Sequence, residues 1–348
     1  MHSPTTVGRA WLLLTAMVFL VLQAAILRWV PGTLTPWTVA YIVLVEFFIV
    51  GVAYDAATTL LGLVVRPLPI PRREVEKGRQ ARAALVCTIC DDVDPGTLAN
   101  LRRHAAGGVA VYVLDDSTDP RARASVAASG LQVVRRETRR GYKAGNLNHW
   151  CAIYGDQFDY VAVADADSRL PVGFVTQMLE YAEHPANADV ASFESLISPW
   201  NRDTPFADLQ AVLTPIEHRF GLGLVNRTAA TLSAGHNNLI RLAALQDVGG
   251  FDERFLAEDQ ATTVHLLQRG WRCVTVPVHS HERVPANIGE YMRRQARWAY
   301  QTFQLSSLAT TGLSAGCALR LAMCLQQQAG PVALLRCDSW PLSCSIRS

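Results

Sequence analysis

Two aspartates stand one residue apart at the end of an apolar segment, YVAVADAD, at residues 160–167. The small and β-branched residues of this segment are typical of a buried strand. Asp165 and Asp167 occupy positions i and i+2, so their side chains leave the strand on the same side. Together they could hold one hard divalent cation, Mg²⁺ or Mn²⁺, whose coordination substrate phosphates would complete. Two surface acids at a strand end would give the same short pattern.

Acidic residues also end a second predicted strand, VAVYVLDD (109–116), at Asp115 and Asp116. Ligands bind beyond the carboxyl ends of parallel strands, and two acidic strand ends at one edge need a cation to relieve their repulsion. The basic stretch RRETRRGYKAGNLNHW (135–150) follows a third predicted strand. Its Lys143 could stabilise a phosphate as a point charge, although by itself the stretch is only a basic loop.

Two helical segments late in the chain carry the remaining candidates. In FDERFLAEDQATTVHLLQRGW (251–271), Glu258 and Asp259 stand at the start of a predicted helix, where acids also serve as caps. In EYMRRQARWAYQ (290–301), Arg297 and Trp298 are neighbours; a plain amphipathic helix with a basic solvent face would look similar.

Strands and helices alternate around these candidates. Strands are predicted at 83–90, 109–116, 131–136 and 160–167, and helices at 94–106, 143–155 and 171–184. This alternation predicts an α/β domain with a mostly parallel sheet flanked by helices.

Two apolar stretches precede this domain, at 11–27 and 38–65, and each is long enough to cross a membrane. A basic flank follows the second stretch, so the positive-inside rule predicts a helical hairpin with the domain in the cytosol: a multi-pass protein of the cell membrane. The basic residues are Arg66, Arg72, Arg73, Lys77, Arg79 and Arg82. The chain of 348 residues has a net charge of only +2, which gives no reason to expect a nucleic-acid partner.

Cysteines offer little chemistry. Cys87 and Cys90 form a CxxC pair inside an apolar strand, but no second Cys or His pair follows at zinc-binding spacing. In a cytosolic domain we expect reduced, buried thiols.

In chain order, the candidate segments resemble the membrane-bound family 2 glycosyltransferases, which include cellulose synthase, hyaluronan synthase and bacterial glucan glucosyltransferases. The resemblance runs from about residue 83 to residue 302. The matching motifs are VLDDS (113–117), KAGNLN (143–148), DAD (165–167), AGHN (234–237) followed by GGF (249–251), AED (257–259) and RQARW (294–298). The residues GHN (235–237) and the segment ERVPANIGEY (282–291) are most similar to the glucan glucosyltransferases.

The resemblance implies a GT-A fold, a divalent metal (Mg²⁺ or Mn²⁺), a nucleotide-sugar donor such as UDP-glucose, and a glycan or lipid acceptor. Asp259 would be the general base of an inverting transfer, and Asp165 and Asp167 would hold metal and diphosphate. The implied nucleotide-sugar contacts are Asp115, Asp116, Lys143, Asn146 and Arg297. The implied acceptor contacts are Asn237, Glu258, Gln295 and Trp298.

Three departures accompany the resemblance. The Thr that often precedes the Glu-Asp pair is Ala257, and the usual Gln of the Arg-Trp motif is Arg294, with Gln295 one place later. The first strand ends CTICDDVD, where relatives usually carry a Tyr-Asn-Glu turn.

The expected organisation has four parts: two membrane helices (1–66), a basic linker (67–82), the GT-A domain (83–302) and a short, altered or truncated C-terminal segment (303–348). That short end puts polymer export in doubt. It also leaves open a second reading, a weakly active or inactive membrane protein that only binds nucleotide or a partner.

Overall fold

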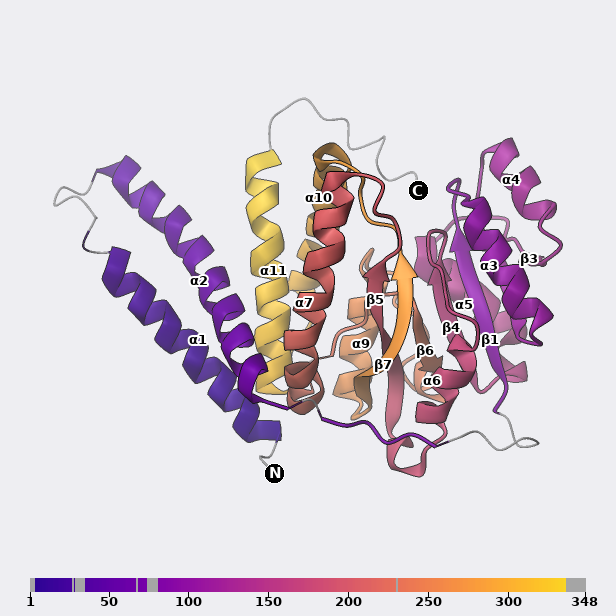
Figure 1. The fold of residues 1–348 in the computed structure, drawn as a ribbon, viewed down its shortest axis with the longest axis horizontal. Coiled ribbons are helices and arrows are strands. Elements are labelled where there is room, and N and C mark those ends of the chain that lie inside the picture. The colour runs from indigo at the N-terminus through magenta and orange to yellow at the C-terminus, as the bar shows by residue number, and fades with distance from the viewer. Residues whose placement is uncertain are drawn as a thin grey trace.

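The computed structural model describes residues 4–26, 28, 35–66, 68–73, 81–229 and 231–335. Its centre is a seven-stranded sheet with strand order β3-β2-β1-β4-β6-β5-β7 (Figure 1). The strands are β1 (Ala83–Ile89), β2 (Ala110–Asp115), β3 (Gln132–Val134), β4 (Tyr160–Asp165), β5 (Val190–Pro199), β6 (Asn238–Arg241) and β7 (Arg272–Glu282).

The sheet is mixed. Strands β1 to β4 pair in parallel, as the alternating pattern predicted, and β5 pairs with β7 in parallel. Strand β6 lies between β4 and β5 and runs antiparallel to both. The mostly parallel sheet is therefore confirmed, and the reversed β6 is an addition that has consequences for the site.

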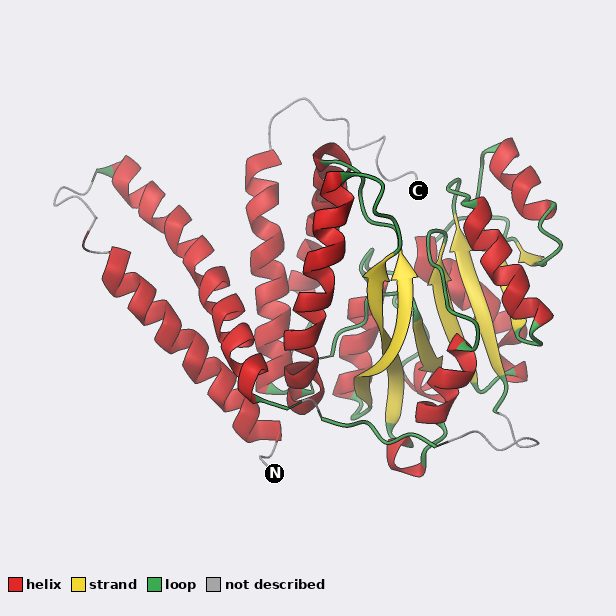
Figure 2. Ribbon diagram, in the orientation of Figure 1, coloured by secondary structure: helices red, strands yellow, loops and turns green. Residues whose placement is uncertain are grey.

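Helices cover both faces of the sheet (Figure 2). On one face, Leu85 of β1 is in a core cluster with Leu101 and Phe174. On the other, Val86 of the same strand clusters with Trp150, as alternating side chains of a strand require. The helices of the domain are α3 (Pro95–Ala106), α4 (Pro120–Ala127), α5 (Tyr142–Tyr154), α6 (Phe174–Ala182), α7 (Pro205–Thr228), α8 (Leu242–Asp247), α9 (Glu258–Gln268), α10 (Ile288–Gln304) and α11 (Ala315–Leu335).

Two helices precede the domain, α1 (Pro4–Ile26) and α2 (Pro36–Val64). By length and composition, both could cross a membrane. In Figure 1 they form a hairpin whose near end lies beside α7 and α11. There Trp11 stacks on Tyr54 with ring centroids 5.2 Å apart, and both share one apolar cluster with Ala261 and Val264 of α9.

Part of the predicted basic flank, including Lys77 and Arg79, lies outside the described residues.

Cys87 is completely buried in β1, and its Sγ lies 3.5 Å from the backbone oxygen of Asp165. Burial raises the pKa of the Cys87 thiol. The described cysteines are all free; Cys87, Cys273 and Cys317 are buried as predicted, whereas Cys90, Cys151 and Cys324 are partly exposed.

Candidate active site

The sheet brings the acidic strand ends together at its carboxyl edge. Ile89 is in register with Asp115 on β2, and Thr88 is in register with Asp165 on β4. Because β6 is antiparallel, the loop that leads into it, 233–237, returns to this same edge. The predicted meeting of the acids therefore occurs, and a loop joins it that strand periodicity alone did not place.

Lys143 is the central cation of this edge. From the first turn of α5, its Nζ lies 2.6 Å from Asp165 Oδ1 and donates to the backbone oxygen of Gly235 at 3.0 Å. Burial raises the pKa of Asp165, but Lys143 and other partners outweigh burial and hold that pKa below its ordinary value. Thr88 Oγ1 also donates to Asp165, at 3.1 Å. Lys143 of the KAGNLN motif and Asp165 of the DAD motif thus meet through one ion pair.

Asp167 is less well compensated than Asp165. Within the described part of the chain, no side chain donates a hydrogen bond to its carboxylate, and the favourable charge of His236 does not outweigh burial. Trp200 Nε1 donates to the backbone oxygen of Asp167 at 3.0 Å. Burial and the neighbouring Asp165 raise the pKa of Asp167 to about 6. A carboxylate that is costly to ionise beside a second carboxylate fits a site for a cation.

A divalent metal therefore fits the pair formed by Asp165 and Asp167. The described residues contain no cluster of three or more His, Cys, Asp or Glu ligands. Mg²⁺ needs no such cluster, because it is commonly held by one or two carboxylates together with substrate phosphates. The donor set is thus that of a metal–phosphate site, not of an all-protein cage.

Two residues of this edge, His236 and Glu282, were not among the sequence candidates. His236 Nε2 lies 2.8 Å from Glu282 Oε2, and its Nδ1 lies 2.9 Å from the oxygen of Ala234 and 3.6 Å from Asp165 Oδ2. Burial lowers the pKa of His236, but Asp165 and Glu282 outweigh it and raise the pKa to about 10. His236 is therefore a cation between two acids. His236 lies in the AGHN motif and Glu282 begins the segment ERVPANIGEY, so the resemblance could have pointed to both residues.

Glu258 and Asp259 lie in the first turn of α9 beside the same loop, with Glu258 buried and Asp259 half-buried. Burial and Asp259 raise the pKa of Glu258 to about 8, and burial also raises the pKa of Asp259. A Cβ atom on Gly235 would lie only 2.7 Å from Asp259 Oδ2, so this carboxylate packs directly on the glycine. Gly235 has φ of +82°, a conformation that favours glycine. The AED motif thus joins the other two motifs at Gly235.

The predicted nucleotide contacts on β2 are held by arginines. Arg135 Nη2 lies 2.7 Å from Asp115 Oδ2, and Arg136 binds both carboxylate oxygens of Asp116, at 2.9 and 2.5 Å. Asn146 is buried and donates to the backbone oxygen of Leu114 at 3.2 Å. These three residues lie near the edge, and their contact with a nucleotide stays a prediction.

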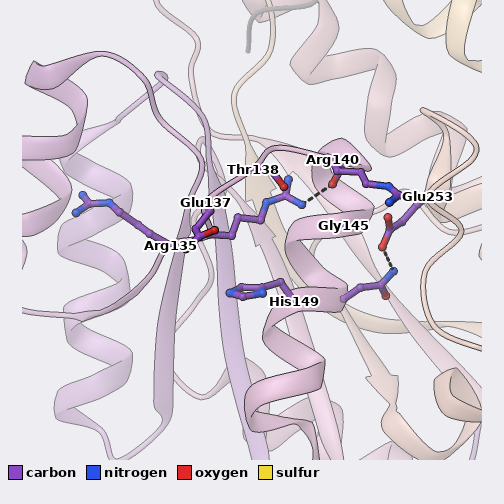
Figure 3. A pocket seen from close by; sticks show the side chains of 9 residues that line it. Arg135, Glu137, Thr138, Arg140, Gly145, His149 and Glu253 are labelled. Carbon is purple, nitrogen blue, oxygen red and sulfur yellow. Dashed lines mark hydrogen bonds between the residues drawn. The ribbon is translucent and has the colours of Figure 1, made fainter.

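A hollow of about 620 Å³ lies beside the acidic edge and not within it (Figure 3). It separates the basic loop after β3 from α5 and from the loop before α9. His149 points into it, and Asn148 Nδ2 donates to Glu253 Oε1 at 2.9 Å along its wall. The lining residues are Arg135, Arg136, Glu137, Thr138, Arg140, Gly145, Asn148, His149 and Glu253.

The predicted acceptor contacts are split between two environments. Trp298 is 38% exposed on α10, and Gln295 is half-buried on the same helix. The guanidinium of Arg294 covers the Trp298 ring, 4.6 Å from its centroid, whereas Arg297 is exposed. Asn237 is completely buried, with its amide nitrogen 3.4 Å from the oxygen of His281, so no acceptor reaches it in this conformation.

Known proteins resemble this chain in sequence. It is 29% identical over 202 residues to a probable glucomannan 4-beta-mannosyltransferase 7 of Oryza sativa subsp. japonica, covering 54% of this chain and 34% of the relative. It is 27% identical over 253 residues to a glucans biosynthesis glucosyltransferase H of Pectobacterium atrosepticum, covering 63% of this chain and 29% of the relative. The chain thus spans about a third of the length of these curated relatives.

A solved structure shares the fold. The mannosyltransferase PcManGT of Pyrobaculum calidifontis, solved in complex with GDP-Man and Mn²⁺, superimposes with a TM-score of 0.55 at 17% identity, over 87% of this chain and 90% of that one. The predicted GT-A fold is confirmed by this likeness and by the seven-stranded mixed sheet between helices.

The profile of the family described as "Glycosyl transferase family group 2" matches residues 160–337, just over half of the chain. This match covers the DAD motif, the loop before β6, the start of α9 and all of α10. The chain belongs to family group 2 of the glycosyl transferases.

Proposed function

We propose that the protein transfers a hexose from a nucleotide sugar, UDP-glucose in the first instance, to a hydroxyl of a glycan or lipid acceptor at the membrane. The observation that carries this proposal is the meeting of three motifs at Gly235. Its backbone oxygen accepts from Lys143, which pairs with Asp165, and its lack of a side chain leaves the space that Asp259 Oδ2 occupies. The relatives' names, a mannosyltransferase and a glucosyltransferase, support transfer of a hexose.

The leaving group of such a reaction is a nucleoside diphosphate, so charge develops on phosphate oxygens. Lys143 is held charged at this edge, because Asp165 and Glu258 outweigh burial and raise its pKa. Asp165 and Asp167 would hold a divalent cation, Mg²⁺ or Mn²⁺, which would neutralise the diphosphate. The complex of PcManGT with Mn²⁺ and a nucleotide sugar supports the same pairing here.

The acceptor hydroxyl needs a base, because an alcohol is a weak nucleophile. Asp259 would take the hydroxyl proton while the oxygen bonds to the anomeric carbon and the bond from that carbon to the diphosphate oxygen breaks. One base and one displacement invert the anomeric centre. Gly235 lets the carboxylate approach, since any side chain at that position would occupy the space of Asp259 Oδ2.

The remaining site residues would bind the two substrates. Nucleotide contacts are proposed for residues at the end of β2 and in α5, and acceptor contacts for residues of α9 and α10. The first group is Asp115, Asp116 and Asn146, with Arg297 carried over from the family pattern; the second is Glu258, Gln295 and Trp298, without the completely buried Asn237.

We place the domain from residue 83 to residue 302 on the cytosolic face, anchored by a hairpin within 1–66 and the linker 67–82, with 303–348 as a short final segment. The packing of α1 and α2 against α7 and α11 supports a hairpin that forms one structural unit with the domain. An enzyme that uses a nucleotide sugar needs access to the cytosolic pool of these donors. The proposed orientation gives the site that access.

The test uses the full-length protein in detergent or lipid nanodiscs. We expect Mg²⁺- or Mn²⁺-dependent release of nucleoside diphosphate from one member of a panel of nucleotide sugars. Mass spectrometry of the product should show one added hexose, and NMR of the new linkage should show inverted anomeric configuration. Absence of turnover with every donor, with and without lipid and oligosaccharide acceptors, would contradict the proposal.

A further inference from the structure

Asn148 of α5 makes a paired contact with the segment 250–253, which leads into α9. Its Nδ2 donates to the backbone oxygen of Phe251 at 2.9 Å, and its Oδ1 accepts from the backbone nitrogen of the same residue at 2.9 Å. Its Nδ2 also donates to Glu253 Oε1 at 2.9 Å (Figure 3). One side-chain amide therefore satisfies both backbone groups of Phe251 and ties the 250–253 segment to α5.

Two glycines leave room for this contact. A Cβ atom on Gly250 would lie 2.8 Å from Asn148 Oδ1, and one on Gly141 would lie 2.5 Å from Glu253 Oε2. Gly141 is the N-cap of α5, and it has no side chain to cap the helix. The Glu253 carboxylate thus lies at the positive end of the α5 dipole, which favours an anion. The contact between the 250–253 segment and α5 therefore has two parts, one at Asn148 and one at the start of the helix.

The 250–253 segment is also tied to α9. The backbone nitrogen of Asp252 donates to Thr262 Oγ1 at 3.1 Å, and Asp252 Oδ2 lies 2.9 Å from His265 Nε2. Thr262 and His265 both belong to α9. The segment therefore joins α5, which carries Lys143 in its first turn, to the helix that carries Asp259.

The position of the Asp259 carboxylate follows that of α9. Asp259 Oδ1 accepts from the backbone nitrogen of Gln260 at 2.8 Å, a contact within α9 itself. Its Oδ2 packs on Gly235, whose backbone oxygen accepts from Lys143. Packing on a glycine leaves the direction of α9 open, so the contact made by Asn148 is a second anchor between the two helices.

We infer that Asn148 is a positioning residue of the transfer reaction, which sets the place of α9, and so of Asp259, relative to Lys143. The inference rests on the proposed function, because it takes Asp259 as the base and Lys143 as the cation at the leaving group. Asn148 acts through α9 and touches neither substrate in this assignment. Loss of its amide should therefore slow the transfer step and leave nucleotide binding almost unchanged.

Asn226 of α7 supplies a matched control, because it makes the same paired contact elsewhere. Its Nδ2 donates to the backbone oxygen of Thr275 at 2.8 Å, and its Oδ1 accepts from the backbone nitrogen of Thr275 at 2.8 Å. Asn226 and Asn148 are both half-buried. Thr275 lies near the start of β7, whereas the acidic edge lies at the end of this strand, at Glu282. Asn226→Ala thus removes the same pair of hydrogen bonds and leaves the contact between α5 and α9 in place.

Asn148→Ala and Asn226→Ala are compared in the full-length protein at matched folded fraction. The measurements are kcat with the preferred donor, and Kd for UDP and GDP with Mn²⁺. We expect Asn148→Ala to lower kcat by about tenfold or more, because a misplacement of about 1 Å can cost on the order of 100-fold in rate. Its nucleotide Kd should change by no more than about twofold, and Asn226→Ala should keep kcat within about twofold of wild type.

A second pair of variants reverses the hydrogen bond between the two side chains. Asn148→Asp removes the donor and places two carboxylates side by side, so kcat should fall at least as far as in Asn148→Ala. Adding Glu253→Gln returns a donor from the other side of the contact. We expect the double variant to recover kcat by about threefold or more over Asn148→Asp, which a general loss of packing would not allow.

Three results would overturn the inference while the proposed function stands, each with a wild type that turns over a donor. The first is equal kcat in Asn148→Ala and Asn226→Ala. The second is a loss of nucleotide affinity in Asn148→Ala as large as its loss of kcat, and the third is a double variant no faster than Asn148→Asp. If the wild type turns over no donor, the proposed function fails first, and the inference fails with it.

Discussion

Replacing Gly235 by Ala tests whether the Asp259 carboxylate must keep its position beside this glycine. The added Cβ would lie 2.7 Å from Asp259 Oδ2, about 0.7 Å short of ordinary van der Waals contact, which begins at 3.4 Å. The Asp259 carboxylate must therefore move. A misplacement of this size in a catalytic group can cost on the order of 100-fold in rate. Asp259 is the proposed base, so we expect kcat to fall by about 10- to 100-fold while nucleotide affinity changes little.

The backbone of Gly235 adds a second effect that needs a control. At φ of +82° an alanine is strained, by about 1–2 kcal/mol, wherever it stands. Gly249 has φ of +87° and nothing within 4 Å of its added Cβ, so Gly249→Ala carries the strain without the clash. Both variants should lose roughly the same stability in thermal unfolding, about 2–8 °C in Tm for a domain of this size.

Gly235→Ala and Gly249→Ala should differ in activity. We expect Gly249→Ala to retain most of its turnover and Gly235→Ala to lose most of it, at matched folded fraction. Equal turnover in the two variants would refute the reasoning, because it would mean that Asp259 can move without effect and does not act as the base.

Three further outcomes follow from the same structure. Asp259→Asn should lose most of its transfer rate with donor binding preserved, and Glu258→Gln should lose less; near wild-type transfer in Asp259→Asn, in single-turnover assays, would leave the mechanism without a base. Burial raises the pKa of Asp252, but hydrogen bonds from Arg254 and His265 outweigh it and lower the pKa to about 2, so this carboxylate should contribute at most about 2 kcal/mol, screened by the exposure of Arg254. That stability is present above pH about 4 and is lost as pH falls toward 2, so Asp252→Asn should lower Tm at pH 7 and converge with wild type at low pH; a constant Tm difference across the titration would contradict the assignment. Reporter fusions should place 66–82 in the cytosol, and an external location would overturn the predicted topology.

Strand periodicity predicted the part of the site that lies at the ends of β2 and β4. Apolar runs ending in acids are local signals, and parallel strands bring their ends together without further information. The pair formed by Asp165 and Asp167 could therefore be found from the eight residues 160–167. Lys143 could be proposed from its motif, but its contact with Gly235 could not.

The missing part depends on contacts between distant segments. His236 and Glu282 are far apart in the chain, and they meet only because β6 is inserted in reverse between β4 and β5. The residue pattern of a single strand does not indicate that β6 runs antiparallel to its neighbours. Likewise the four arginines of 135–150 suggested phosphate binding, whereas two of them, Arg135 and Arg136, are paired with Asp115 and Asp116.

The measurement that tests the account most directly is metal-dependent nucleotide release by wild type and Asp167→Asn in the full-length protein. Burial and the neighbouring Asp165 oppose ionisation of the Asp167 carboxylate, so its loss should remove the cation site and leave the fold unchanged. We predict that the wild type releases nucleoside diphosphate from its donor only with Mg²⁺ or Mn²⁺, and that Asp167→Asn does not release it at any metal concentration. Metal-independent release by the wild type, or wild-type rates in Asp167→Asn, would contradict the account.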